Sequence, residues 1–166
     1  TQEARNRLRF LRMQSVSGKK CKTNSRILSV QTMTAPDDVA ESLGLKKKNQ
    51  VVQITRLLSF NDDAAVFEQI YLPVDIFTDV TADKLTDYKG TLYGWFEAEY
   101  NVRMIRAIEK MRAVIAPASA VELLGLSDNQ PLLFVERISY TYADKPVEVR
   151  HGWYLTQDYY YQNELI

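Results

Sequence analysis

The 166-residue sequence has very few of the residues that form disulfides and metal sites: one cysteine, Cys21, and one histidine, His151. A single cysteine cannot form a disulfide within the chain. One cysteine and one histidine also fall short of the ligand set of a structural zinc site. No serine, cysteine or aspartate near His151 gives it the context of a catalytic triad. We therefore expect no disulfide, no metal and no catalytic residues.

Net charge and long apolar runs are also lacking. The 21 basic residues balance 21 acidic ones, which argues against a protein whose whole surface binds nucleic acid. The apolar runs are far shorter than a membrane-spanning helix, and the chain does not begin with a secretory signal. Neither a glycine-rich phosphate loop nor a dinucleotide fingerprint occurs, so no cofactor is expected. With 46% apolar residues, the sequence predicts one cytoplasmic domain with a hydrophobic core and no membrane contact.

A repeat occupies much of the chain. Residues 36–45 and 117–126 share a proline, a glutamate and the sequence Leu-Gly-Leu in register. The same shift of 81 residues superposes Arg56 on Arg137, and two downstream glutamates align after one residue of slippage. The sequence therefore predicts two diverged copies of one unit, an internal two-fold sequence repeat.

Each copy predicts a short helix followed by a β-hairpin. Proline near the first turn and glycine just past the last turn bracket the helix, and two apolar stretches follow it with turn residues between them. The predicted strands span residues 26–31, 50–60, 64–72, 102–115, 131–141 and 146–155; further helices span residues 1–13, 82–88 and 91–100, and residues 15–25 form a linker or loop. Hairpins with separate helices indicate the α+β class, an antiparallel β-sheet with flanking helices.

Charged residues interrupt the aliphatic faces of the predicted hairpins. Arg56 and Glu68 each alternate with apolar residues, and a charge on such a face is costly unless it is paired. A three-residue loop at residues 61–63 places Arg56 directly opposite Glu68. The second copy carries Arg137 and Glu148, in a register that its turn leaves open.

These charges allow two interpretations. In the first, each hairpin holds an inward salt bridge that is purely structural. In the second, the charges converge with Arg150 and Tyr154, which share the face of Glu148, on a polar ligand whose carboxylate or phosphate fits the planar fork of arginine. Residues 89–96 form another candidate segment, because Thr91 begins a helix whose free N–H groups would bind an anion. The alternative for Thr91 is an ordinary helix cap.

Short motifs occur in a characteristic order over about residues 26–161. They are Glu41-x-Leu43-Gly44-Leu45, Val52-x-Ile54-x-Arg56-Leu57, Glu68-x-x-Tyr71-Leu72-Pro73, Thr91-Leu92-Tyr93, Ala120-x-x-x-Leu124-Gly125-Leu126, Leu132-Leu133-x-Val135-x-Arg137, Pro146-Val147-Glu148 and Tyr154-x-x-x-Asp158-x-Tyr160. In order and spacing they resemble the UTRA domain, the effector-binding domain of HutC-subfamily GntR-type transcription regulators.

The resemblance implies a chorismate-lyase-like fold over residues 23–166. It implies that residues 1–22 are the linker remnant of a missing N-terminal winged helix-turn-helix, through which alone the protein would contact DNA. It also implies a homodimer whose DNA affinity is modulated by a small effector: a carboxylate, an amine, or a sugar or phosphosugar metabolite. The alternative function on the same fold is a chorismate-lyase-like enzyme that acts on a small carboxylated metabolite.

The resemblance also assigns effector contacts. The positions that match the family pattern are Arg56, Glu68, Thr91, Tyr93, Glu148 and Tyr154, and with Arg137 and Arg150 they form the candidate effector-binding site. Leu58 departs from the pattern, because sugar-phosphate sensors of the family have a second arginine there. Its loss removes a charge-assisted hydrogen bond worth about 1.5–3 kcal/mol. A carboxylate or an amine therefore fits this chain as well as a phosphosugar does.

Overall fold

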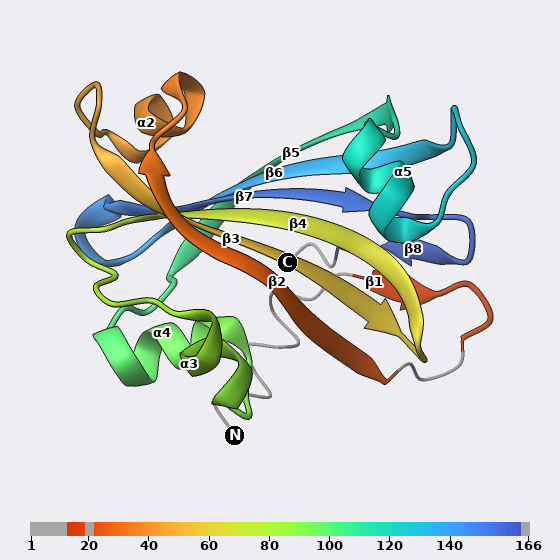
Figure 1. Cartoon of the computed structure of the whole chain (residues 1–166), viewed down its shortest axis with the longest axis horizontal. Helices are drawn as coiled ribbons and strands as arrows, with labels where there is room; N and C mark the ends of the chain where they lie inside the picture. The colour runs from red at the N-terminus through yellow and green to blue at the C-terminus, as the bar shows by residue number, and fades with distance from the viewer. Residues whose placement is uncertain (1–12, 19–21, 164–166) are drawn as a thin grey trace.

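The strands and helices of the chain are arranged around one large sheet (Figure 1). The computed structural model describes residues 13–18 and 22–163. The strands are β1 (Met13–Ser15), β2 (Thr23–Thr34), β3 (Gln50–Phe60), β4 (Asp63–Pro73), β5 (Arg106–Ile115), β6 (Pro131–Tyr140), β7 (Pro146–Tyr154) and β8 (Tyr159–Tyr161). The helices are α2 (Asp37–Leu43), α3 (Ala82–Asp87), α4 (Leu92–Tyr100), α5 (Ala118–Leu124) and the short 3-10 turn η1 (Tyr142–Asp144).

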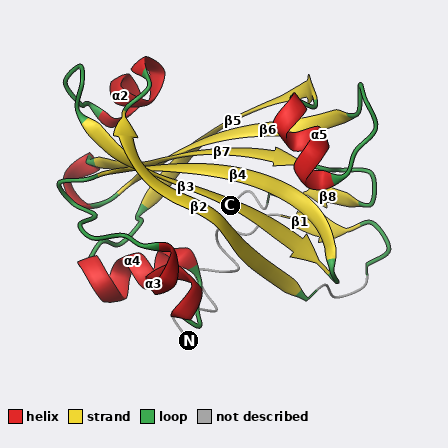
Figure 2. Cartoon of the chain, in the orientation of Figure 1, coloured by secondary structure: helices red, strands yellow, loops and turns green. Residues whose placement is uncertain are grey.

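The sheet has six strands in the order β2-β3-β4-β7-β6-β5, and every neighbouring pair is antiparallel. Strands β1 and β8 form a separate two-stranded ribbon. Figure 2 shows the helices lying outside the sheet, as connections between strands. The predicted α+β class, an antiparallel sheet with flanking helices, is confirmed.

Glycine ends both helices of the predicted repeat. Gly44 follows α2 with φ of 65°, and Gly125 follows α5 with φ of 63°. This left-handed conformation strains a residue that carries a Cβ, so glycine is favoured there. Each helix begins after a proline, as the bracket of proline and glycine predicts.

Several predicted boundaries are wrong. The loop expected at residues 61–63 is one residue shorter, because Phe60 pairs with Asp63. The loop expected at residues 15–25 is shorter at both ends, because Ser15 belongs to β1, where it pairs with Tyr159, and β2 already begins at Thr23. Strand β5 begins at Arg106 rather than at residue 102, because residues 101–105 end α4 and return the chain to the sheet. The helix expected over residues 1–13 lies outside the described residues except for Met13, which belongs to β1.

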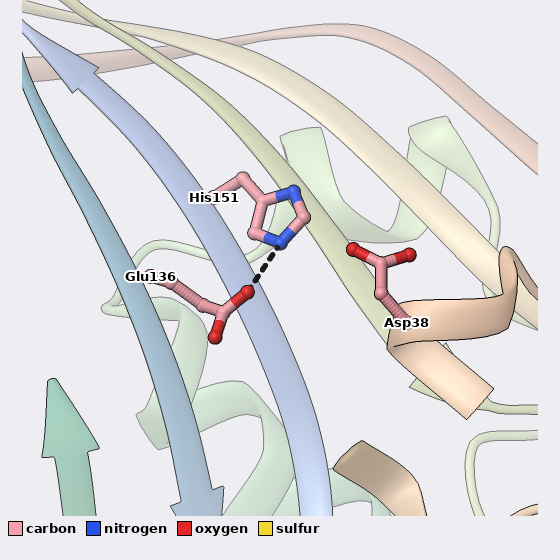
Figure 3. Close-up of side chains that lie close together, drawn as sticks. All are labelled: Asp38, Glu136 and His151. Atoms are coloured by element: carbon pink, nitrogen blue, oxygen red, sulfur yellow. Dashed lines mark hydrogen bonds and ion pairs between the residues drawn. The ribbon is translucent and has the colours of Figure 1, made fainter. Parts of the chain in front are cut away.

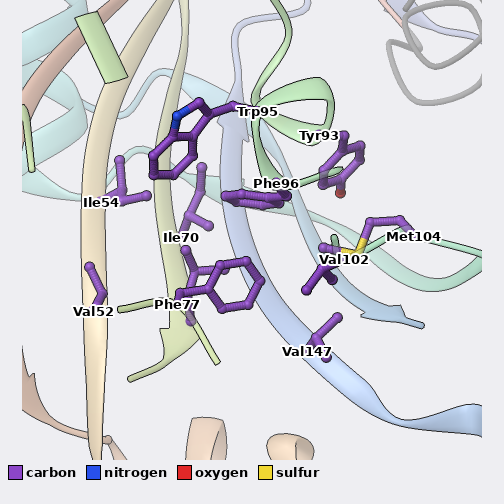
Figure 4. Packing of buried hydrophobic residues seen from close by; sticks show 11 residues of the cluster. Val52, Ile54, Ile70, Phe77, Tyr93, Trp95, Phe96, Val102, Met104 and Val147 are labelled. Atoms are coloured by element: carbon purple, nitrogen blue, oxygen red, sulfur yellow. The ribbon is translucent and has the colours of Figure 1, made fainter. Parts of the chain in front are cut away.

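The two faces of the sheet are covered by different helices. Buried residues of α2 pack against Val51, Tyr71, Ile138 and Val149, and buried residues of α5 pack against the same face further along the strands. The other face holds α4, whose Trp95 and other aromatic residues pack on the strands as Figure 4 shows. That second face also carries the buried charged residues Arg56 of β3, Glu68 of β4, Arg137 of β6, and Glu148 and Arg150 of β7.

The strand order is symmetric about the β4–β7 pair. On one side of that pair β4 is followed outward by β3 and β2, and on the other side β7 is followed outward by β6 and β5. Each side contains a helix joined to a hairpin, α2-β3-β4 and α5-β6-β7. This arrangement has the form expected for two copies of one unit, although the repeat itself stays a prediction from the sequence. The charged residues lie beside the seam where the two units meet.

Candidate functional site

A cavity of about 660 Å³ opens between the sheet and the α3–α4 region. Its floor comes from β3, β4, β6 and β7, and its sides come from the start of β2 and from residues between 85 and 95. Seven predicted site residues line it: Arg56, Glu68, Thr91, Tyr93, Arg137, Arg150 and Tyr154. The eighth, Glu148, is fully buried and is not among the lining residues.

Arg56 and Glu68 form the ion pair predicted for the first hairpin. They are direct cross-strand partners, and Arg56 Nη2 donates to Glu68 Oε1 at 3.3 Å. Glu68 also faces Arg150 across the β4–β7 seam, where Arg150 Nη1 lies 3.3 Å from Glu68 Oε2. This second contact is an ion pair by distance, but its angle is too poor for a hydrogen bond, since Glu68 Oε2 has no hydrogen-bond partner among the described residues.

The second hairpin does not repeat the pairing of the first. Arg137 lies opposite Arg150, and Glu148 lies opposite Ser139. The turn pairs Tyr140 with Pro146, and a bulge between Ser139 and Tyr140 then shifts the register by one further residue, so a direct Arg137–Glu148 pair does not form. Two arginines directly opposite each other repel unless counter-charges are close.

Each of these opposed arginines has its own carboxylate. Arg137 Nε donates to Glu109 Oε2 at 3.0 Å, and the Tyr161 hydroxyl donates to the same oxygen. Arg150 Nη2 donates to Glu148 Oε2 at 2.8 Å. Sequence reasoning missed Glu109 although a signal was present, because on its face of β5 Glu109 alternates with the apolar residues Ala107, Met111, Ala113 and Ile115.

Glu148 is buried below the cavity floor and accepts hydrogen bonds from three side chains. Its Oε1 accepts from the Tyr93 hydroxyl at 2.6 Å and from Ser139 Oγ at 3.0 Å, while its Oε2 accepts from Arg150. The Arg150 guanidinium carbon lies 4.8 Å from the centre of the Tyr93 ring. Glu148 therefore fixes the positions of the lining residues Tyr93 and Arg150 rather than facing the cavity itself. Ser139, fully buried, was not predicted.

Burial and charge together set the protonation of the site. Burial alone would raise the pKa of the Glu68 carboxyl, but Arg56 and Arg150 outweigh it and hold this pKa below its ordinary value. Burial raises the pKa of the Tyr93 hydroxyl. Burial also opposes the charge of Arg150, yet the negative charge nearby, above all Glu148, raises the pKa of Arg150. At neutral pH the floor thus presents charged guanidinium groups, a charged Glu68 and a neutral tyrosine.

Thr91 has the role of a helix cap. Its side-chain oxygen accepts from the Gly94 N–H at 3.0 Å at the start of α4, and Thr91 also lines the cavity. The cap turns the first residues of α4 so that Tyr93 reaches the floor of the cavity. The anion site proposed for the N–H groups at this helix start is therefore partly taken by the Thr91 side chain itself.

The sequence and the fold match one known domain family. The UTRA domain matches residues 18–160. The chain belongs to the UTRA family. It is similar to the ligand-binding domain of a chain described as a GntR-family transcriptional regulator from Bordetella bronchiseptica, with a TM-score of 0.91 and 44% identity over 95% of this chain and 98% of that chain.

Curated relatives of this UTRA domain are transcription regulators. It is 33% identical over 129 residues to the HTH-type transcriptional regulator Rv0792c of Mycobacterium tuberculosis, covering 74% of this chain and 45% of the relative. It is 28% identical over 137 residues to the HTH-type transcriptional repressor STM4068 of Salmonella typhimurium, covering 82% of this chain and 55% of the relative. The chain thus spans about half the length of these relatives, and neither is named as an enzyme. In the described part of the UTRA domain, no helix is long and apolar enough to cross a membrane.

Leu58 gives the cavity of this UTRA domain an apolar side. It lines the cavity two residues after Arg56, on the same face of β3, and packs in a buried cluster with Val66 and Tyr154. The family pattern would place a second arginine of β3 there. The arginines that line the cavity come instead one from each of four strands: Arg26 of β2, Arg56 of β3, Arg137 of β6 and Arg150 of β7.

Proposed function

We propose that this UTRA domain binds a small anionic metabolite in the cavity, and that binding regulates DNA affinity in another region of the full-length protein. The observation that carries the proposal is the convergence of Arg56, Arg137 and Arg150 on a cavity of about 660 Å³. This volume lies in the range of sites for small ligands. The similarity to a domain described as ligand-binding, at 44% identity, supports the same function.

The charges around the cavity favour an anion. Five lining residues are cationic and one is anionic: Arg26, Arg56, Lys89, Arg137 and Arg150 against Glu68. A cavity lined by one sign of charge raises the local concentration of the opposite ion. The positive lining therefore favours a carboxylate or a phosphate over an amine.

The arginines on the floor are incompletely bonded. Arg56 Nε and Arg150 Nε are buried and have no hydrogen-bond partner among residues 13–18 and 22–163. Buried donors without partners are rare in native proteins. An anion in the cavity offers these donors an acceptor in addition to Glu68. A ligand anion would then complete the bonding of both side chains.

Leu58 favours a carboxylate over a phosphate. A phosphate carries more charge and accepts more hydrogen bonds, and the β3 strand offers it Arg56 alone. Leu58 instead provides apolar surface that would contact the carbon skeleton of a ligand. We therefore expect a carboxylated metabolite with an apolar portion.

The test is a thermal-shift and calorimetric screen with charge-matched pairs of compounds: carboxylates against their amides, and sugar phosphates against the parent sugars. At a ligand concentration of 100 times Kd, binding stabilises the folded state by about 2.7 kcal/mol. For a chain of this length that raises Tm by about 5–11 °C. Carboxylates should shift Tm and amides should not. A screen in which amides and carboxylates act alike, or in which nothing binds, would overturn the proposal.

Matched arginine variants locate the binding. Arg56→Gln and Arg137→Gln should each abolish the shift caused by a carboxylate, whereas Arg103→Gln, which alters an exposed arginine outside the cavity, should leave it unchanged. Far-UV circular dichroism of each variant shows whether the fold survives.

The regulatory half of the proposal needs the full-length protein. Saturating carboxylate should change the affinity of that protein for its DNA site in a fluorescence-anisotropy titration. An unchanged affinity would refute the regulatory half.

A homodimer is part of the same proposal. Strand β5 lies at one edge of the sheet and exposes Ile108, Met111 and Ile115, which are 42%, 44% and 59% accessible. An exposed edge strand with large apolar side chains is a template for pairing with another strand. We propose that a second copy of this chain covers β5.

A further inference from the structure

Three ligand-bearing side chains meet on the face of the sheet that lies opposite the cavity. Figure 3 shows Asp38, from the first turn of α2, and Glu136, from β6, on either side of the His151 imidazole of β7. One potential ligand atom from each residue lies within 4.8 Å of the other two. Among the described residues this is the one group of three or more His, Cys, Asp or Glu side chains so arranged.

Two of the three ligands already have the spacing of a metal site. His151 Nε2 and Glu136 Oε2 are 3.2 Å apart. Around a tetrahedral zinc ion with bonds of about 2.0–2.1 Å, neighbouring ligand atoms are roughly 3.3 Å apart. The third ligand, Asp38, has an exposed side chain, so a change of its rotamer can close the remaining gap.

The backbone and the neighbouring rings fix the first two ligands. Glu136 and His151 are cross-strand partners in the β6–β7 pair, so their spacing is set by the sheet. The His151 ring contacts the rings of Tyr71 and Phe134, each with centroids 5.5 Å apart. A metal site gains affinity when its ligands are held in place before the ion arrives.

The group lacks a matching positive charge. The two carboxylates face one histidine, and the nearest ion-pair partner of Glu136 apart from His151 is Lys110, whose Nζ lies 4.0 Å away on a side chain that is 72% exposed. No lysine or arginine among residues 13–18 and 22–163 forms an ion pair with Asp38. A divalent cation would neutralise both carboxylates and accept the imidazole nitrogen.

We propose that Asp38, Glu136 and His151 bind a divalent transition-metal ion. The ligand set of one imidazole and two carboxylates suits Zn²⁺ and its neighbours in the first transition row better than Ca²⁺ or Mg²⁺, which prefer all-oxygen sites. Three protein ligands leave at least one position for water or for a group from another molecule. The ion would tie α2 to the central strands β6 and β7.

The site stands apart from the proposed effector cavity but shares its strands. Glu136 precedes Arg137 on β6, and His151 follows Arg150 on β7. Successive side chains of a strand point to opposite faces, so each metal ligand is the backbone neighbour of a cavity arginine. An ion on one face would stiffen the strands that carry the arginines on the other.

The test is a titration of tag-free protein with Zn²⁺, in competition with a fluorescent chelator. The expected result is one Zn²⁺ per chain. The affinity for Zn²⁺ should fall by about tenfold to a hundredfold in each of Asp38→Asn, Glu136→Gln and His151→Gln. The matched controls Asp37→Asn, on the same turn of α2, and Cys21→Ser should bind Zn²⁺ as the wild type does. Far-UV circular dichroism checks the fold of each variant, and Asp38→Asn, which changes an exposed side chain, should fold as the wild type does.

NMR spectroscopy provides a second readout. His151 is the only histidine in the chain, so the imidazole nitrogen signals belong to it without ambiguity. Saturating Zn²⁺ should move the Nε2 signal and leave the fold intact. The proposal is overturned if no saturable binding occurs, if His151→Gln binds Zn²⁺ as tightly as the wild type, or if the control Cys21→Ser loses the ion.

Discussion

The substitution Glu68→Gln tests how much the buried charges of the cavity floor stabilise the fold. Glu68 is 1% exposed and lies within 3.3 Å of guanidinium nitrogens of both Arg56 and Arg150. Removing one member of a buried ion pair costs about 3–5 kcal/mol, because the other charge stays buried without compensation. Glutamine keeps the volume and one acceptor oxygen, and Arg150 keeps its pair with Glu148. We therefore expect the low end of the range, about 3 kcal/mol.

Urea unfolding at pH 7, followed by circular dichroism, measures this loss. A loss of about 3 kcal/mol corresponds to a fall in Tm of roughly 6–12 °C for a domain of this size. The control is Glu122→Gln, which changes an exposed carboxylate of α5 and should alter stability by no more than about 0.5 kcal/mol. If Glu68→Gln unfolds within about 0.5 kcal/mol of the wild type, the charges on the floor do not stabilise each other as described.

The pH dependence gives an independent check. The pKa of Glu68 is lowered in the folded state, by the arginines that outweigh the opposing effect of burial. An unfolded chain therefore takes up the proton of this residue at a higher pH than the folded chain does, and the stability that Glu68 provides is present above the unfolded pKa of about 4.3 and is lost as pH falls through the folded pKa. The difference in free energy of unfolding between wild type and Glu68→Gln should be largest near pH 7 and shrink below about pH 4. A difference that stays constant down to acid pH would refute the reasoning.

Three further substitutions probe the fold and the site. Tyr93→Phe removes the hydroxyl that donates to Glu148 at 2.6 Å and should lower the free energy of unfolding in urea by about 1–3 kcal/mol; an unchanged midpoint would contradict this role. Gly152→Ala places a Cβ only 2.6 Å from Tyr154 Cε2, so the ring must move, at about 1–3 kcal/mol in the same assay; wild-type stability would show that the ring has free space. Met111→Lys adds a charge to the exposed edge of the sheet and should shift sedimentation from dimer toward monomer, and an unaltered dimer would place the interface elsewhere.

The contact between Arg56 and Glu68 could be predicted from the sequence because it is local. The loop is one residue shorter than predicted, because Phe60 pairs with Asp63, and a bulge between Leu58 and Ser59 restores the register in which Arg56 faces Glu68. The second hairpin resisted the same reasoning. Both turns contain two non-glycine residues with positive φ, Asn61 and Asp62 in the first and Ala143 and Asp144 in the second. The bulge of the first hairpin restores the predicted register, whereas the bulge of the second hairpin moves Arg137 one residue further from Glu148. Turn conformations of this kind are not encoded by the alternation of apolar and polar residues.

Contacts between distant elements escaped prediction for a different reason. The pair of Arg137 with Glu109 depends on β5 crossing to the far edge of the sheet, with α5 between the two strands in the chain. The group of Asp38, Glu136 and His151 needs three elements to pack together, and a count of cysteine and histidine overlooks it because carboxylates supply two of its three ligands. Residue patterns predict which side chains share a face of a strand and where a helix begins and ends. They do not predict which faces pack against each other, because that depends on the tertiary structure.

The position of Glu68 bears on how the domain unfolds. Its carboxylate lies on β4 in one helix-hairpin unit, whereas its cationic partners lie on β3 of that unit and on β7 of the other. If one unit unfolded alone, Glu68 would lose Arg150 or Arg150 would lose Glu68. The unit that stays folded would then hold a charge with one counter-ion fewer, and this is costly. A partly folded chain with one unit intact is therefore strongly disfavoured. The two halves are expected to lose their structure together, in one cooperative transition rather than one after the other.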